Sequence, residues 1–215
     1  MSAAGVSGGG RFITLEGGEG VGKSTQLAAL AQALRARGLD PLVTREPGGS
    51  EGAEAIRALL LEGEAGRWGA RAEALLFAAA RADHLEKTIL PALAAGRWVL
   101  SDRFLDSSRA YQSGASGLDD DDILTLHRIG SAGKLPDRTL LLHLPEAEAA
   151  ARAAQRDRGG ADRIGGRDAA YHARVASAFA RQAAEDPARF RTVDASGTPA
   201  AVTARLVATL TDLLP

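Results

Sequence analysis

The chain has 215 residues, of which 45% are hydrophobic and 25% are charged, and its formal net charge is −1. This size and composition fit one globular domain, and the near-zero charge gives no overall field to attract nucleic acid or an anionic membrane. The chain contains no cysteine, which excludes disulfides and thiolate metal sites and suits the cytoplasm. No apolar run approaches the ~20 residues of a membrane span. We therefore expect neither nucleic acid nor a membrane as a partner.

Short apolar strands alternate with longer helical patterns along the chain. Residues 1–10 have neither the basic start nor the apolar stretch of a signal peptide and are predicted to form a flexible tail. Strands are predicted at 11–16, 41–46, 97–102, 138–144 and 190–193. Helices are predicted at 22–37, 51–62, 70–95, 104–113, 119–131, 145–157, 168–185 and 199–213. This alternation predicts one α/β domain over 11–215, with a five-stranded parallel sheet covered by helices on both faces.

A glycine-rich loop joins the first strand to the first helix. Its pattern G-x(4)-G-K-[ST] is met by Gly17, Gly22, Lys23 and Ser24. Backbone N–H groups in such a loop can surround a polyphosphate, and the helix that follows adds its positive end. Lys23 would reach the β- and γ-phosphates, and the Ser24 hydroxyl would bind Mg²⁺. The predicted ATP-binding residues are Gly17, Gly18, Glu19, Gly20, Val21, Gly22, Lys23, Ser24 and Thr25.

The strand "RWVLSD" ends in a carboxylate that suits a metal–phosphate site. P-loop proteins hold Mg²⁺ partly through a carboxylate at the end of a neighbouring strand, often through water. Asp102 is predicted to be that group, and Arg103, directly after it, can grip phosphate oxygens with its planar fork. The alternative is a salt bridge at the end of the strand. Predicted metal ligands are Ser24 and Asp102.

Four further segments carry a family resemblance. "TREPGGS" (44–50), "AEALLFAAARADH" (72–84), "SDRFLDSSRAYQSG" (101–114) and "DRI" (162–164) occur in the order and spacing seen in thymidylate kinases. The chain resembles the bacterial members of this family over nearly its whole length. The resemblance implies the P-loop NTPase fold, transfer of the ATP γ-phosphoryl group to dTMP with Mg²⁺, and a homodimer.

The residues that would hold the acceptor lie on two helical segments and one turn. Phe77 and Arg81 are four apart, so they share a helix face on which a ring can stack on a base and an arginine can donate to a base carbonyl. By its pattern alone, Phe77 would sooner be read as ordinary core. Ser108 and Gln112, also four apart, could hydrogen-bond a pyrimidine edge. The residues assigned to dTMP are Glu19, Arg45, Pro47, Arg57, Phe77, Arg81, Arg103, Ser107, Ser108, Tyr111 and Gln112.

Individual roles within this set follow from the resemblance. It implies that Arg45, Arg57 and Arg103 hold the dTMP phosphate, and that Arg81 faces O4 of thymine. It also implies that Tyr111 crowds the sugar 2′ position and that Glu19 lies near the sugar 3′-hydroxyl and the metal. A carboxylate in an anion-binding loop is otherwise costly, so a hydroxyl or a cation is its expected partner.

A segment near 155–168 is rich in arginine, aspartate and glycine, and it has no packing pattern. Its composition alone is typical of a solvated loop. The P-loop contains no arginine, and in the family that form accompanies a lid which supplies one. We expect Arg158 or Arg156, rather than Arg163, to close over the phosphates. The predicted catalytic residues are Lys23, Glu19, Asp102, Arg103, Arg156 and Arg158.

Two other functions remain open at this stage. The chain could be a P-loop kinase for UMP, CMP or AMP, or a regulatory P-loop ATPase that acts through a partner. A guanine-reading N-K-x-D segment is absent from the sequence, which speaks against a GTP-driven switch. The loop "VDASGTP" (193–199) is predicted either to contact adenine or to form only a turn and a helix cap at Ser196 or Thr198.

Overall fold

The computed structural model describes residues 9–64, 66–156 and 163–215. In this part of the chain, parallel strands form one sheet in the order β2-β3-β1-β4-β5. The strands are β1 (Phe12–Glu16), β2 (Leu42–Arg45), β3 (Val99–Asp102), β4 (Arg138–His143) and β5 (Phe190–Asp194). Each boundary lies within two residues of its predicted position, so the predicted five-stranded parallel sheet is confirmed.

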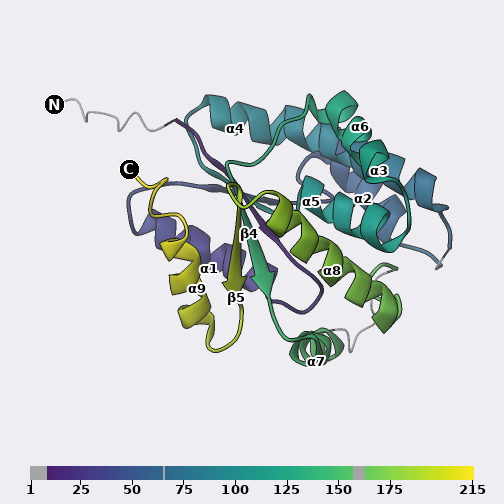
Figure 1. Ribbon diagram of the computed structural model, residues 1–215. Helices are drawn as coiled ribbons and strands as arrows, with labels where there is room; N and C mark the ends of the chain where they lie inside the picture. The colour runs from purple at the N-terminus through teal and green to yellow at the C-terminus, as the bar shows by residue number, and fades with distance from the viewer. Residues whose placement is uncertain (1–8, 65, 157–162) are drawn as a thin grey trace.

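Helices cover both faces of this sheet (Figure 1). One face carries α1 (Lys23–Arg35) and α9 (Pro199–Ala208), which contact each other. The other face carries the remaining long helices, among them α3 (Ala70–His84), α6 (Asp120–Ser131) and α8 (Ala169–Glu185). Helix α2 (Glu51–Leu61) packs on α3, and α7 (Glu146–Arg156) lies beside the glycine-rich loop, where the Gly20 backbone closely approaches that of Ala149.

The core is divided between the two faces. Leu30 and Leu34 of α1 pack with Leu100 and Leu140 of the central strands on one side. On the other side, the Phe12 and Phe104 rings meet edge to face, with centroids 4.9 Å apart. All five residues of β1 are buried, as expected for a central parallel strand covered on both faces. Packing on both faces therefore positions the carboxyl ends of the central strands, where polar side chains follow.

Two helical segments differ from the prediction in their winding. The predicted helix 70–95 is continuous but contains a π-helical turn, η1 (Leu85–Ile89), before α4 (Leu90–Ala94). Pro91, which has no N–H to donate, is the second residue after this wider turn. The predicted helix near 104–113 is α5 (Leu105–Ser108) continued by the π-helical segment η2 (Arg109–Ala115). The last helix ends at Ala208, and turns follow it.

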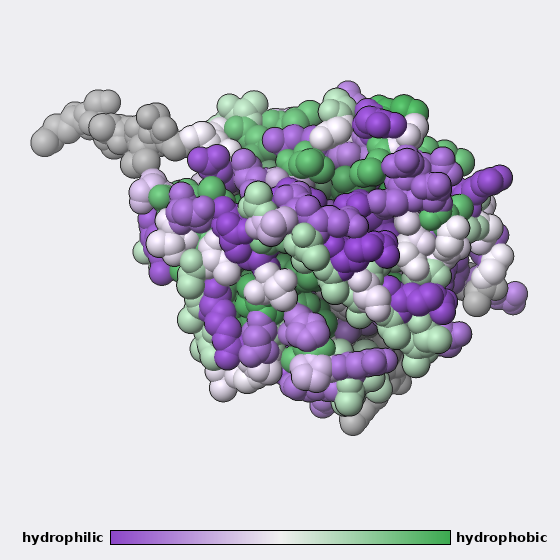
Figure 2. Space-filling view, in the orientation of Figure 1, coloured by the Kyte–Doolittle hydropathy of each residue, from purple (hydrophilic) through white to green (hydrophobic). Residues whose placement is uncertain are grey.

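No helix among the described residues is both long enough and apolar enough to cross a membrane. The surface nevertheless exposes several large apolar side chains on one group of helices. Leu75 of α3, Leu90 of α4 and Ile129 of α6 are 56%, 44% and 78% exposed. Figure 2 shows hydrophobic residues gathered along the upper edge of the molecule, where Figure 1 places α4 and α6.

Candidate active site

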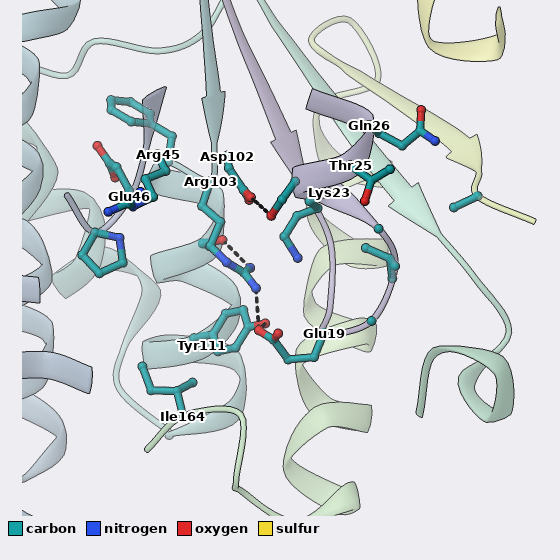
Figure 3. Close-up of a pocket in the computed structure, with 18 of the residues that line it drawn as sticks. Glu19, Lys23, Thr25, Gln26, Arg45, Glu46, Asp102, Arg103, Tyr111 and Ile164 are labelled. Carbon is teal, nitrogen blue, oxygen red and sulfur yellow. Dashed lines mark hydrogen bonds and ion pairs between the residues drawn. The ribbon is translucent and has the colours of Figure 1, made fainter. Parts of the chain in front are cut away.

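A cleft of about 830 Å³ opens at the carboxyl ends of the central strands. Parallel α/β sheets commonly bind ligands in this position, because the loops that leave the strands diverge there. Among the described residues, every predicted ATP- and dTMP-binding residue lines the cleft except Gly17 and Gly18. Figure 3 shows Arg45 and Glu46 at one end, Thr25 and Gln26 at the other, and Lys23, Asp102 and Arg103 between them. The cleft therefore has two ends that meet at one set of charged groups.

The glycine-rich loop adopts a conformation that only glycine tolerates at its first position. Gly17 has φ 138°, and a Cβ there would lie 2.6 Å from the Leu142 carbonyl oxygen. Gly22, with φ 89°, is the last residue before α1. The loop thus connects β1 to the start of a 13-residue helix. The first N–H groups of this helix have no partner within the helix, and they lie at the cleft.

Lys23 is buried beneath this loop. Its Nζ donates to the carbonyl oxygens of Gly17 and Gly18, at 3.1 and 2.7 Å. Burial, followed by the nearby Arg103 guanidinium, lowers the pKa of Lys23 to about 8. Gly17 and Gly18 therefore contribute through their carbonyls, which hold the lysine in place although neither residue lines the cleft.

The predicted metal pair is assembled across the sheet. Ser24 Oγ donates a hydrogen bond of 2.9 Å to Asp102 Oδ2. The other carboxylate oxygen, Oδ1, is buried and has no hydrogen-bond partner among the described residues. No arginine or lysine forms an ion pair with Asp102 in the described part of the chain, which contradicts the alternative of a salt bridge at the end of the strand. A hydroxyl beside a carboxylate oxygen without a partner suits a hard, oxygen-binding cation.

Arg103 is held at the centre of the cleft in an unusual backbone conformation. Its φ is 72°, a region that few non-glycine residues occupy, and such strain is often found at functional sites. Its guanidinium donates to Gly17 O at 3.1 Å and forms an ion pair of 2.6 Å with Glu19. It also lies over the Tyr111 ring, whose hydroxyl donates to Glu19. The expected cationic partner of Glu19 is thus Arg103.

Glu16, which the sequence analysis missed, supports this conformation from below. It is fully buried at the end of β1, and its carboxyl group accepts hydrogen bonds from Phe104 N–H at 2.8 Å and Ser107 Oγ at 2.6 Å. Ser107 in turn accepts from Arg103. Burial raises the pKa of Glu16 to about 8, and the negative charge of Asp106 contributes. The position just before a glycine-rich loop was the only signal in the sequence.

The part of the cleft that is expected to hold the base is organised around Arg81. This side chain is buried and donates to Glu46 Oε2 at 2.8 Å and to Ser108 Oγ at 2.9 Å. Glu46 also contacts the buried His84 ring. Phe77, one turn before Arg81, lines the cleft and is only partly buried, so it is not simply core. Sequence reasoning missed Glu46. A buried arginine such as Arg81 needs a carboxylate to pair with its charge, and Glu46 is that carboxylate.

The two arginines expected to bind the acceptor phosphate together with Arg103 come from β2 and α2. Arg45 is half exposed and pairs with Glu54 at 3.0 Å. Arg57 donates to the Pro47 carbonyl at 2.6 Å, which ties α2 to the turn after β2. Gly49 in this turn has φ 88°, and a Cβ there would lie 2.4 Å from His84 and Thr44 side-chain atoms. Arg45 and Arg57 both line the cleft, as does Arg103 at its centre.

Most of the predicted lid lies outside the residues that the structure describes. Residues 157–162, and therefore Arg158, lie outside the described residues, as does the side chain of Arg156. Arg163 is buried and forms an ion pair of 2.6 Å with Glu73, which agrees with the preference for the other two arginines. Arg152 of α7, which the sequence analysis missed, lines the cleft.

The far end of the cleft is formed by the loop after β5. Ala195, Gly197 and Pro199 line it together with Gln26, whose amide donates to the Pro199 carbonyl. Thr198 is the N-cap of α9 and accepts from Ala201 N–H. The predicted cap is therefore Thr198 rather than Ser196. The loop is both a helix cap and a wall of the cleft.

Comparisons with known proteins agree with this geometry. A family model described as thymidylate kinase matches residues 15–206. The chain is 68% identical over 206 residues to a thymidylate kinase of Rhizorhabdus wittichii, covering 96% of this chain and 99% of that one. It is 47% identical over 211 residues to a thymidylate kinase of Bradyrhizobium diazoefficiens, covering 97% of this chain and 92% of that one.

A solved structure shows the same fold. The crystal structure of a thymidylate kinase from Ehrlichia chaffeensis superposes with a TM-score of 0.74 at 30% identity, covering 94% of this chain and 98% of that chain. Sequence relatives that match nearly end to end and a family model that spans most of the chain support the same assignment. The chain therefore belongs to the thymidylate kinase family.

Proposed function

We propose that this chain is a dTMP kinase, which transfers the γ-phosphoryl group of ATP to the 5′-phosphate of dTMP and gives ADP and dTDP. The observation that carries the proposal is the cleft itself, which is lined at once by the P-loop and by Arg45, Arg81 and Arg103 from other elements. A regulatory ATPase would not need these additional arginines beside its ATP site. Family membership favours dTMP over UMP, CMP or AMP as the acceptor.

The residues of the cleft supply positioning and positive charge rather than covalent chemistry. A dTMP phosphate oxygen is already a nucleophile, so no general base is needed, and catalysis relies on alignment and charge neutralisation. Lys23 serves the β- and γ-phosphates of the donor. Arg45, Arg57 and Arg103 hold the acceptor phosphate, and Arg103, at the centre of the cleft, also contacts Gly17 and Glu19 of the P-loop. Glu19 and Tyr111 face the acceptor sugar.

We propose Mg²⁺ as the cofactor, held by Ser24 and Asp102 together with phosphate oxygens of ATP. The fit rests on the Ser24–Asp102 hydrogen bond and on the buried Asp102 Oδ1, which has no partner among the described residues. When bound, the ion would neutralise charge on the phosphates. On the protein side, Ser24 fixes the orientation of the carboxylate, and β3 fixes its distance from the loop.

The lid remains part of the proposal. Arg156 or Arg158 would add positive charge over the phosphates and exclude water on closure. The double variant with alanine at both positions should lose turnover by far more than threefold while dTMP affinity changes little. Turnover within about threefold of wild type would contradict the lid. The single variant Arg152→Ala measures how much this other arginine of α7 contributes to turnover, apart from Arg156 and Arg158.

We also propose that residues 11–215 act as one domain in a cytoplasmic homodimer. The exposed Leu75, Leu90 and Ile129 lie on neighbouring helices and give an apolar surface for a second copy. Light scattering on a sizing column should give about twice the 22.2 kDa chain mass. Aspartate at Ile129 should shift this to the monomer.

The activity is tested by ADP release with ATP and Mg²⁺ and one added acceptor: dTMP, dUMP, UMP, CMP, AMP or GMP. We expect strong turnover with dTMP, weaker turnover with dUMP and little with the ribonucleotides. Preference for another monophosphate would leave the donor site intact and overturn the assignment of the acceptor. ATP binding without any acceptor-dependent turnover would favour the regulatory ATPase.

A further inference from the structure

Glu73 of α3 is a buried carboxylate that joins three segments of the chain. It is 2% exposed, and its Oε1 accepts from Gln112 Nε2 at 3.1 Å. Its Oε2 accepts from Arg163 at 2.6 Å and from Arg167 at 2.8 Å. Glu73 itself does not line the cleft, whereas Gln112 does. Any effect of Glu73 on a ligand must therefore pass through its neighbours.

The contact with Glu73 determines which way the Gln112 amide faces. A carboxylate beside two guanidinium groups only accepts hydrogen bonds, so the amide must turn its NH₂ group toward it. The carbonyl oxygen then lies on the opposite side of the planar amide, and no hydrogen bond to another described residue uses it. Gln112 therefore offers a ligand in the cleft a hydrogen-bond acceptor.

Arg81 offers the complementary group at the same end of the cleft. Its Nε and Nη2 are occupied by Glu46, Phe104 and Ser108, whereas Nη1 has no hydrogen-bond partner among the described residues. Arginine can only donate. A donor next to an acceptor matches a pyrimidine edge with a carbonyl beside an N–H, as in thymine and uracil. Cytosine presents an amino group and a bare ring nitrogen instead, which is the opposite pattern.

We propose that Glu73 is a positioning residue that fixes the Gln112 amide and thereby makes the cleft select thymine or uracil over cytosine. The proposal rests on the proposed function, because it concerns the acceptor base of the same reaction. The inference differs from the proposed function because it predicts selection at one edge of the base. The bases of dTMP and dUMP share that edge, and the base of dCMP does not.

Glutamine at position 73 is the informative variant. Its carbonyl can still accept from Arg163, and its NH₂ can then donate to Gln112, which turns the Gln112 amide so that its own NH₂ faces the cleft. In E73Q we expect kcat/KM for dTMP relative to dCMP to fall by about tenfold or more, the usual effect of one mismatched hydrogen bond in a closed pocket. The ratio of dTMP to dUMP should stay within twofold of wild type.

Two further variants separate positioning from folding. D120N is the matched control, because Asp120 forms an ion pair of 2.6 Å with Arg109, the first residue of the π-helical segment that also contains Gln112. This variant should leave the dTMP-to-dCMP ratio unchanged. E73D keeps a carboxylate near Arg163 but draws it back from Gln112. If E73Q does not fold, E73D carries the test, and we expect it to lower the same ratio.

A double-variant cycle shows whether Glu73 acts through Gln112. In a Gln112→Met background, which has no amide to orient, E73Q should leave the dTMP-to-dCMP ratio unchanged. A folded E73Q whose ratio stays within twofold of wild type would overturn the proposal, as would an equal loss with dTMP, dUMP and dCMP. The wild-type control distinguishes a failure of the proposed function from a failure of the inference about Glu73. Absence of dTMP turnover there overturns the proposed function and this inference with it, whereas an active wild type with an unchanged ratio in E73Q overturns only the inference.

Discussion

Ser24 and Asp102 are 78 residues apart in the chain, yet the Ser24 hydroxyl donates to Asp102 Oδ2 at 2.9 Å. The contact joins the first turn of α1 to the end of β3, because β1 and β3 are paired in parallel and both run toward the cleft. The sheet therefore brings a hydroxyl and a carboxylate together at one point of the cleft, and both are oxygen ligands that suit a hard cation.

Alanine at Ser24 or asparagine at Asp102 should lower kcat by about 100-fold, because each removes an oxygen ligand or its charge at a site of phosphoryl transfer. Each variant should also need more Mg²⁺ for half-maximal turnover, measured by titrating Mg²⁺ at saturating ATP and dTMP. The double variant should lose less than the product of the two effects, because the residues touch. Ser177→Ala, at an exposed serine on α8, is the control. A normal Mg²⁺ requirement in both variants would contradict the assigned ligands.

The affinity for ATP should fall as the pH rises above about 8. Burial lowers the pKa of Lys23 to about 8 in the free protein, so this side chain is protonated below that pH and neutral above it. The triphosphate binds the protonated form and raises its pKa, so the loss begins near pH 8 and ends at the higher pKa of the complex. Calorimetry from pH 7 to 9.5 measures it. Lys23→Gln should bind weakly with no such decline, and Lys87→Gln, at an exposed lysine, should follow wild type.

Glu16 should make the folded state less stable, relative to a Glu16→Gln variant, as the pH rises from about 4.5 to 8. Burial raises the pKa of Glu16 to about 8, so in that window the unfolded chain loses the proton while the folded chain keeps it. The sign follows directly: this contribution is full at low pH and is lost toward pH 8, by about 1.4 kcal/mol per pH unit at the steepest. Urea unfolding of both proteins at several pH values measures the difference. A difference that does not change with pH would refute the assigned protonation.

Removing Glu46 should cost much more stability than removing Glu54. Glu46 is the buried partner of Arg81, and alanine there leaves a buried guanidinium without its charge partner, at about 3–5 kcal/mol. The Glu54–Arg45 pair is half exposed, so its loss should cost about 1 kcal/mol or less. Glu46→Ala should also weaken dTMP binding, because Arg81 loses its orientation. Equal unfolding free energies for the two variants would contradict this difference.

The glycine-rich loop and the sheet could be predicted from the sequence because both depend on local patterns. Gly17, Gly22 and Lys23 define the loop by spacing alone, and the apolar strands alternate with helical periods. The π-helical turns at η1 and η2 were not predictable, since they change which backbone groups pair without changing the apolar pattern. The resemblance to a family supplied the acceptor residues, which composition and spacing alone left open.

The buried carboxylates mark the limit of sequence reasoning. Glu16, Glu46 and Glu73 looked like ordinary polar positions, yet each is buried and holds a residue of the cleft. Their partners lie between 35 and 94 residues away in the chain, so no local pattern reports them. The sequence by itself determined the phosphate loop, the order of the elements and the family. Only the tertiary structure decided which carboxylate orients which cleft side chain, because a buried charge takes whatever partner the packing brings within hydrogen-bond distance.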